Sequence, residues 1–244
     1  MDKIISITLC VFVIILAAFA GFFVYNTYVD AAYRNTFSGT YTYTCTITTD
    51  APLYNVTFFI PVPVDPAGNS PMVSAFSSRT MKGVPPTWNT TLFDTGKSTL
   101  LKITVPAVVP PDGTTASHPS TVAFSLETAS PLPVDTLNPV EKSALFRPVQ
   151  ELKGKACTQE RAGGSARCFT YTTAVYAEYQ TAAETIVTIT SSVTGKNSWT
   201  VFEPRSNEYH SDVSLSMNGE HHGWAVLDGE LTTGFGTYAM FEGS

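Results

Sequence analysis

The strongest strand signal in the chain is the run GTYTYTCTIT at residues 39–48. Tyr, Cys and Ile alternate with Thr throughout this run. Because successive side chains of a strand point to opposite faces, the apolar set should face a core and the Thr set should face water. We therefore expect Cys45 to be a buried and unreactive thiol, since a buried free Cys behaves as a small hydrophobe.

Similar short segments recur along the chain and predict an all-β domain. The expected strands are residues 53–61, 72–77, 87–93, 98–105, 121–127, 169–179, 185–194, 198–202, 213–217, 224–231 and 235–241. Turn residues separate them, for example Gly195-Lys196-Asn197. This spacing predicts an extracytoplasmic β-sandwich of about 10–12 strands, immunoglobulin-like or jelly-roll-like. Residues 130–148 hold four prolines and predict an irregular crossing segment or a seam between subdomains.

Residues 4–25 form an uncharged apolar run of 22 residues. At 1.5 Å per residue, a helix of this length crosses the roughly 30 Å hydrocarbon layer of a bilayer. We expect one N-terminal transmembrane helix here, within a segment 1–34 that also holds a short juxtamembrane extension. The domain 35–244 follows it.

A cleaved signal peptide is the alternative for this segment. Lys3 precedes a short apolar core, and Ala18-Phe19-Ala20 fits a cleavage site after Ala20. The apolar run continues to Tyr25, however, and Tyr25, Tyr28 and Tyr33 suit a membrane–water interface. The sequence favours an uncleaved signal anchor and leaves cleavage open.

Three features predict that the large domain lies on the extracytoplasmic side of a cell membrane. Asn55 and Asn89 each begin an N-x-[ST] acceptor for glycosylation. Cys157 and Cys168 bracket a Gly-containing segment, and we expect a disulfide between them. The expected topology is single-pass, with the lipid bilayer as the partner of the helix.

Composition excludes one class of partner. The net charge is −6, charged residues make up 14% of the chain, and the basic residues form no run. Nucleic-acid binding needs a basic patch or stripe, so no nucleic-acid partner is expected. A protein or glycan partner is left unidentified.

Candidate chemistry concentrates near the C-terminus. Glu220, His221 and His222, with His210 on the preceding strand, are residue types that bind zinc or copper. Adjacent His side chains on an extended backbone point to opposite faces, which opposes joint ligation. A solvated hairpin tip is the favoured interpretation, and no metal or other cofactor is expected.

Trp88, Trp199 and Trp224 are a second candidate, as a sugar-binding platform. One Trp in each of three separate strand regions is more typical of a core, so this interpretation is not the favoured one. Residues 96–99 imitate the end of a phosphate-binding loop, but the required earlier Gly is Thr91 and a strand follows.

Two segments resemble uncharacterised, membrane-anchored surface proteins of archaea. They are Asp135-Thr136-Leu137-Asn138-Pro139 and the stretch from Gly223-Trp224 to Gly234-Phe235-Gly236. The resemblance implies a place on the outer membrane face, and it implies no activity or catalytic residues.

No nucleophile–base pair was found in the sequence. We therefore expect a non-enzymatic surface protein whose β domain serves binding, adhesion or envelope structure. An accessory subunit of a membrane complex and an extracytoplasmic hydrolase are the alternatives.

Overall fold

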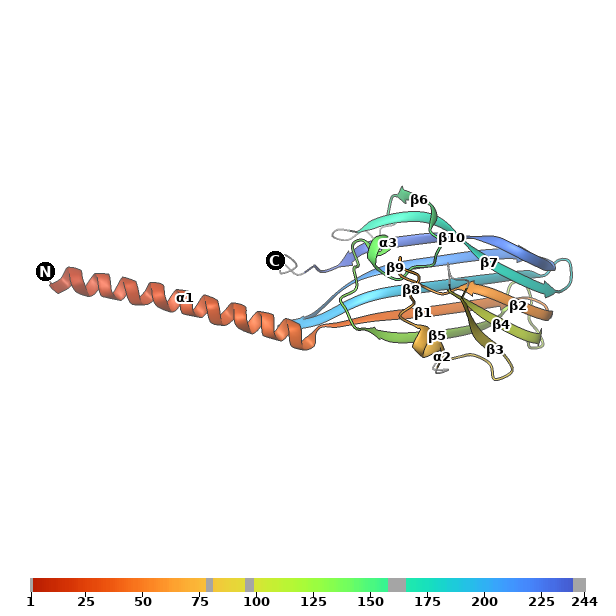
Figure 1. The fold of residues 1–244 in the computed structure, drawn as a ribbon, viewed down its shortest axis with the longest axis horizontal. Coiled ribbons are helices and arrows are strands. Elements are labelled where there is room, and N and C mark those ends of the chain that lie inside the picture. Colours follow the sequence, from red (N-terminus) through yellow and green to blue (C-terminus); the bar gives the residue numbers. More distant parts are fainter. Residues whose placement is uncertain (1, 78–80, 95–98, 158–165, 239–244) are drawn as a thin grey trace. The chain divides into compact units, whose positions relative to one another are not determined.

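The computed structural model describes residues 2–77, 81–94, 99–157 and 166–238 (Figure 1). The chain divides into two compact units. One consists of Met1–Ser38 with Ser198–Arg205, and the other of Gly39–Asn197 with Ser206–Ser244.

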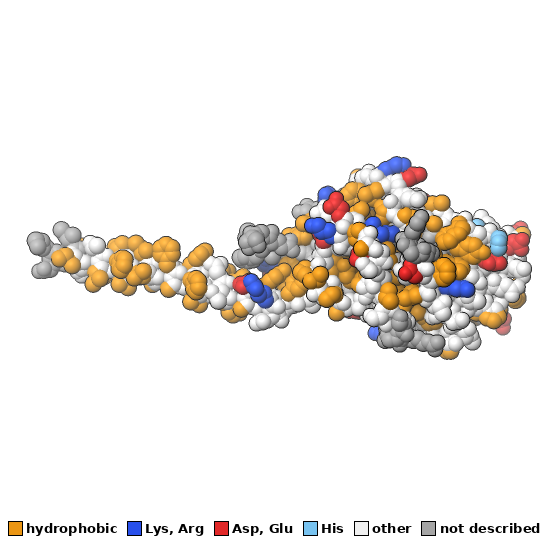
Figure 2. All heavy atoms as spheres, in the orientation of Figure 1, with side chains coloured by type: hydrophobic (Ala, Val, Ile, Leu, Met, Phe, Trp, Pro, Cys, Tyr) orange, Lys and Arg blue, Asp and Glu red, His pale blue; other side chains and the backbone are white. Residues whose placement is uncertain are grey.

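The first unit is built on a long apolar helix, α1 (Asp2–Thr36). An 18-residue window within Ile5–Thr36 reaches a mean hydropathy of 2.9, and none of it is buried. Figure 2 shows hydrophobic side chains along this helix. Its length and composition fit a membrane span and also fit a signal sequence, so α1 indicates a secretory or membrane route.

The helix continues beyond the predicted span, as expected from the sequence. Arg34 lies one turn after Asp30, and its Nε is 3.0 Å from a carboxylate oxygen of that residue. Such i,i+4 pairs stabilise a helix modestly. α1 ends at Thr36, directly before the first strand.

Most of the remaining described residues form a ten-stranded antiparallel sheet that curls on itself (Figure 1). Its strands are β1 (Ser38–Thr49), β2 (Leu53–Pro61), β3 (Asn89–Asp94), β4 (Thr99–Val108), β5 (Ser120–Ser130), β6 (Gln150–Lys155), β7 (Arg167–Gln180), β8 (Ile186–Val201), β9 (Glu203–Asn218) and β10 (His221–Gly236). The spatial order is β3-β4-β2-β7-β10-β9-β8-β1-β5, and β6 pairs with β7. The late strands β7, β10, β9 and β8 therefore form the middle of the sheet, with the early strands on both sides of them.

The mostly β fold is confirmed, but its architecture differs from the expected sandwich. The structure shows one curled sheet rather than two packed sheets. The connection from β2 to β3 and the connection from β5 to β6 cover its apolar side, and we call them the crossing segments. They contain the short helices α2 (Val73–Ser77) and α3 (Pro139–Lys142) respectively. These segments bridge to each other where Val64 pairs with Leu145. Alternation identifies a buried face in each strand but not what covers that face.

Aromatic packing joins the crossing segments to the sheet. The buried ring of Tyr43 on β1 lies 5.7 Å from Phe76 and 6.3 Å from Phe146, between ring centroids. The Tyr209 hydroxyl on β9 donates a hydrogen bond to the carbonyl of Ala144. The crossing segments therefore belong to the main hydrophobic core.

Residues 130–148, for which the sequence predicted either a crossing segment or a seam between subdomains, belong to the second crossing segment. Asn197 on β8 fixes this segment from the sheet. Its Oδ1 accepts from the Val134 amide at 2.9 Å, and its Nδ2 donates to the Val134 carbonyl at 2.8 Å and to Asn207 Oδ1 at 2.9 Å. These buried groups are satisfied by one another, which makes the placement specific.

Several element predictions are corrected. Residues 72–77 were expected to be a strand and contain α2 instead. The expected strands 185–194 and 198–202 are one strand, β8, without a turn at Gly195-Lys196-Asn197. The expected strands 224–231 and 235–241 are likewise the single strand β10 as far as Gly236, with residues 239–241 outside the described part. The strand β6 was not predicted.

The cysteine predictions are confirmed. Cys157 and Cys168 form a disulfide with their Cα atoms 5.2 Å apart, which is consistent with an extracytoplasmic location. Cys45 is a free thiol with 1% of its surface exposed. Burial raises the pKa of this thiol to about 12, so it stays protonated and unreactive at neutral pH.

Candidate ligand-binding face

The sheet face opposite the core is mainly covered by short hydroxyl side chains. They pair across neighbouring strands as Thr44 with Ser192 at 2.6 Å, Thr190 with Ser214 at 3.2 Å, and Thr188 with Ser216 at 3.3 Å. Thr and Ser at these positions satisfy one another or water. This part of the face offers a ligand no large apolar surface.

One region of the same face is different. Four aromatic side chains lie there side by side, and we call them the aromatic row: Phe93 on β3, Phe59 on β2, Tyr176 on β7 and Trp224 on β10. Figure 2 shows hydrophobic side chains gathered beside a histidine over the region where Figure 1 draws β2 and β7.

Strand register brings the row together. Tyr176 lies opposite Phe59 in the β2–β7 pair and opposite Trp224 in the β7–β10 pair. Successive ring centroids are 5.5, 5.5 and 5.7 Å apart from Phe93 to Trp224, and each pair meets edge to face. This geometry is favourable for aromatic pairs, so the row is ordered without a ligand.

The row also stabilises the sheet, since cross-strand aromatic pairs contribute roughly 0.2–1 kcal/mol each. The row is also exposed at both of its ends. Trp224 is 62% exposed and Phe93 is 49% exposed, and Val226, two residues along β10, is 61% exposed. These exposed side chains form an apolar patch on a face that otherwise carries hydroxyl pairs, which makes the patch a candidate binding surface.

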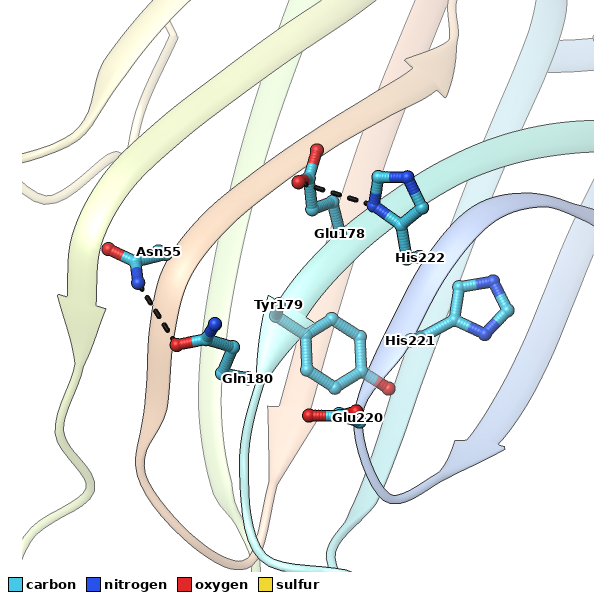
Figure 3. A pocket seen from close by; sticks show the side chains of 7 residues that line it. All are labelled: Asn55, Glu178, Tyr179, Gln180, Glu220, His221 and His222. Atoms are coloured by element: carbon cyan, nitrogen blue, oxygen red, sulfur yellow. Dashed lines mark hydrogen bonds and ion pairs between the residues drawn. The ribbon is translucent and has the colours of Figure 1, made fainter.

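A polar cleft of about 230 Å³ adjoins the aromatic row (Figure 3). Its lining residues are Asn55, Glu178, Tyr179, Gln180, Glu220, His221 and His222. They come from β2, from the end of β7, from the start of β10 and from the turn before it. Two carboxylates, two amides and two imidazoles thus surround one opening.

Two contacts join the polar cleft to the row. The Tyr176 hydroxyl donates to Glu178 Oε2 at 2.9 Å, and this hydrogen bond raises the pKa of Tyr176. Glu178 Oε1 lies 3.2 Å from Nδ1 of His222, whose ring centroid is 6.2 Å from that of Tyr176. Glu178 and His222 therefore belong both to the cleft and to the face that carries the row, whereas Tyr179 and His221 lie in the core-facing phase of the same two strands.

The cleft holds unused hydrogen-bonding capacity. Among the described residues, the Tyr179 hydroxyl and Nε2 of His221 are buried and have no hydrogen-bond partner. Their rings stack with centroids 6.5 Å apart. A buried polar group without a partner costs about 1–3 kcal/mol, so a water or a ligand group that reached these atoms would be stabilised there.

The predicted metal candidates are not assembled into one group. Nδ1 of His210 forms a hydrogen bond with Oγ1 of Thr194 at 2.6 Å, and Nε2 of His210 lies 3.1 Å from Oδ1 of Asp212. His210 lies opposite Thr232 of β10 in the β9–β10 pair. Thr232 is ten residues from His222 along β10, which is a distance of about 30 Å in a strand. Within the described residues, no three His, Cys, Asp or Glu side chains gather as metal ligands would.

The favoured core interpretation of the tryptophans is confirmed for two of the three and is wrong for Trp224. Trp88 and Trp199 are 9% and 4% exposed, while Trp224 lies on the surface. The other members of the row were missed. Their signal was readable in part, because Phe59 and Tyr176 occupy the outward phase of strands whose neighbouring positions face the core.

The remaining sequence candidates lie as follows. Asn55 and Asn89 are both exposed, and Nδ2 of Asn55 donates to Gln180 Oε1 at 3.1 Å inside the polar cleft. Most of the loop-like motif at residues 96–99 falls outside the described residues.

Comparison with known proteins adds no assignment. The chain matches no protein-family model, no curated protein and no solved structure.

Proposed function

We propose that this chain is a membrane-anchored, extracytoplasmic binding protein whose β domain binds carbohydrate through the aromatic row and the polar cleft. The observation that carries the proposal is the exposed row itself, set in a face of Thr and Ser. Its role is binding without catalysis.

The anchoring part of the proposal rests on α1. The helix is uncharged across residues 4–25 and is long enough to span a bilayer. The disulfide and the two exposed acceptor asparagines suit an extracytoplasmic domain. The helix is proposed to stay attached as a signal anchor, as the apolar run beyond Ala20 favours.

Carbohydrate suits both parts of the site. One face of a pyranose ring is formed largely of C–H groups, which pack on aromatic rings, and its hydroxyls pair with carboxylates and amides. Glu178, Gln180 and Glu220 supply acceptors and donors at one end of the row.

A protein partner is less well supported by this surface. A stable protein interface buries about 800 Å² on each side around a packed apolar centre. Beyond the aromatic row, the described part of this face carries hydroxyl pairs such as Thr190 with Ser214, which suit a polar ligand better than a packed apolar interface.

A glycan array with the full chain in nanodiscs tests the proposal. Wild-type protein should bind at least one class of oligosaccharide. Trp224→Ala should weaken that binding about tenfold, or roughly 1.4 kcal/mol, because it removes the most exposed ring. Leu132→Ala is the matched control, since Leu132 is an exposed apolar residue outside the row.

Three results would count against the proposal. Equal binding by the wild type and Trp224→Ala would remove the row from recognition. Absence of glycan binding together with a stoichiometric protein that co-purifies only when Trp224 is present would assign the face to a protein partner. Recovery of shortened or modified oligosaccharide would show catalysis and contradict the non-enzymatic role.

A further inference from the structure

The end of the β8–β9 hairpin packs on α1 within the first unit. Thr36 Oγ1 donates to the Thr200 carbonyl at 3.0 Å and accepts from the Thr200 amide at 2.9 Å. The buried ring of Trp199 meets the ring of Tyr33 with centroids 5.8 Å apart. These contacts fix the hairpin end along the last turns of the helix.

Phe202, the residue between β8 and β9, lies further along the same side of α1. Its ring stacks on Tyr25 at 6.1 Å and contacts Tyr28 at 6.0 Å, between centroids. These contacts leave most of it uncovered, because Phe202 is 71% exposed, Tyr28 58% and Tyr25 53%. Three large aromatic side chains therefore form one exposed cluster, which we call the tip cluster.

The backbone at this position is unusual. Phe202 has a φ of 69°, in the left-handed region that Gly or Asn normally occupies in a turn. A bulky residue held there costs about 1–3 kcal/mol, and such costs concentrate where a residue has a function. A Gly would make the turn without that cost, but it would not present an aromatic ring.

We infer that the tip cluster lies in the headgroup region of the lipid bilayer, so that the β8–β9 hairpin is a second membrane contact beside α1. This inference rests on the anchoring part of the proposed function. Lipid is the expected partner of the tip cluster because the cluster is continuous with the predicted span, whose last residue is Tyr25.

Helix geometry sets the depth of the cluster. Tyr28 lies three residues beyond Tyr25, which is about 4.5 Å along the helix axis. If Tyr25 closes the hydrocarbon span, both tyrosines lie in the interfacial layer that Tyr and Trp prefer. Phe202 contacts both rings and lies at the same depth. Glu203 and Arg205, which pair at 3.0 Å, place charge directly after the ring on β9.

Tryptophan quenching by brominated lipid tests the inference on the full chain in nanodiscs. Phe202→Trp reports on the tip cluster, and Phe19→Trp reports on the middle of α1. Each is compared with the wild type, whose three tryptophans give the background. Phe202→Trp should lose more emission than wild type with bromine near the headgroup. Phe19→Trp should lose more with bromine near the chain end.

The two variants separate the inference from the proposed function. Extra quenching of Phe19→Trp with Phe202→Trp equal to the wild type would overturn the inference and leave the anchor intact. No extra quenching of either variant would overturn both. Near-ultraviolet circular dichroism matching the wild type confirms that each variant is folded.

Discussion

At the scale of single residues, the core holds tyrosine hydroxyls and a cysteine thiol that can lose their protons only with difficulty. Tyr43, Tyr209 and Cys45 are at most 1% exposed. Burial raises the pKa of both tyrosines well above 10.0 and raises the pKa of Cys45 from 9.0 to about 12. In each case the folded state favours the protonated form because the charged form would lose its hydration.

This predicts a fold that weakens in alkali. A pKa that is higher in the folded than in the unfolded state gives stability that is complete below the unfolded value and is lost as pH rises towards the folded value. For Cys45 alone the loss is roughly 1.4 kcal/mol for each pH unit above 9.0, up to about pH 12. Urea unfolding in detergent from pH 7 to pH 11 measures this loss of the free energy of unfolding.

Removal of a single buried hydroxyl tests whether buried ionisable groups cause the loss of stability in alkali. Tyr43→Phe removes one buried group that ionises and keeps the ring, so its stability should fall less steeply with pH than that of the wild type. Tyr54→Phe, at an exposed position, should keep the wild-type slope. A free energy of unfolding that stays constant from pH 8 to pH 11 would contradict this account.

At the scale of elements, β8 shows what sequence reasoning misses. Gly195-Lys196-Asn197 carries turn residues, yet the strand runs through it. Gly195 is needed because a Cβ there would overlap the ring of Tyr209. Asn197 is needed because its amide bonds the crossing segment at Val134. Both reasons involve partners on other elements, which a local turn signal does not contain.

The glycine gives an element-scale prediction. Gly195→Ala should destabilise the fold by about 1–3 kcal/mol, because the added methyl forces the Tyr209 ring and its neighbours to shift. Gly154→Ala on β6 is the matched control, since nothing lies within 4 Å of its added Cβ. Thermal unfolding of both variants measures the difference, and equal melting temperatures would show that β8 does not need the glycine.

At the scale of the whole molecule, the sequence predicted the kinds of element better than their arrangement. Alternation located β1, β7 and most other strands, and the apolar run located α1. The order that places β2 beside β7 depends on contacts between distant segments, and no local period encodes it. The aromatic row was missed for the same reason, because Phe59, Tyr176 and Trp224 meet only through strand register.

The central proposal is that an intact α1 holds the β domain outside the cell. Peptide mapping by mass spectrometry of protease-treated intact cells tests this directly. We expect peptides of the β domain to be released outside, with sugar on Asn89, and peptides of α1 upstream of Ala20 to stay in the membrane fraction. A soluble chain that begins at Gly21, or a β domain protected from the protease, would contradict the account.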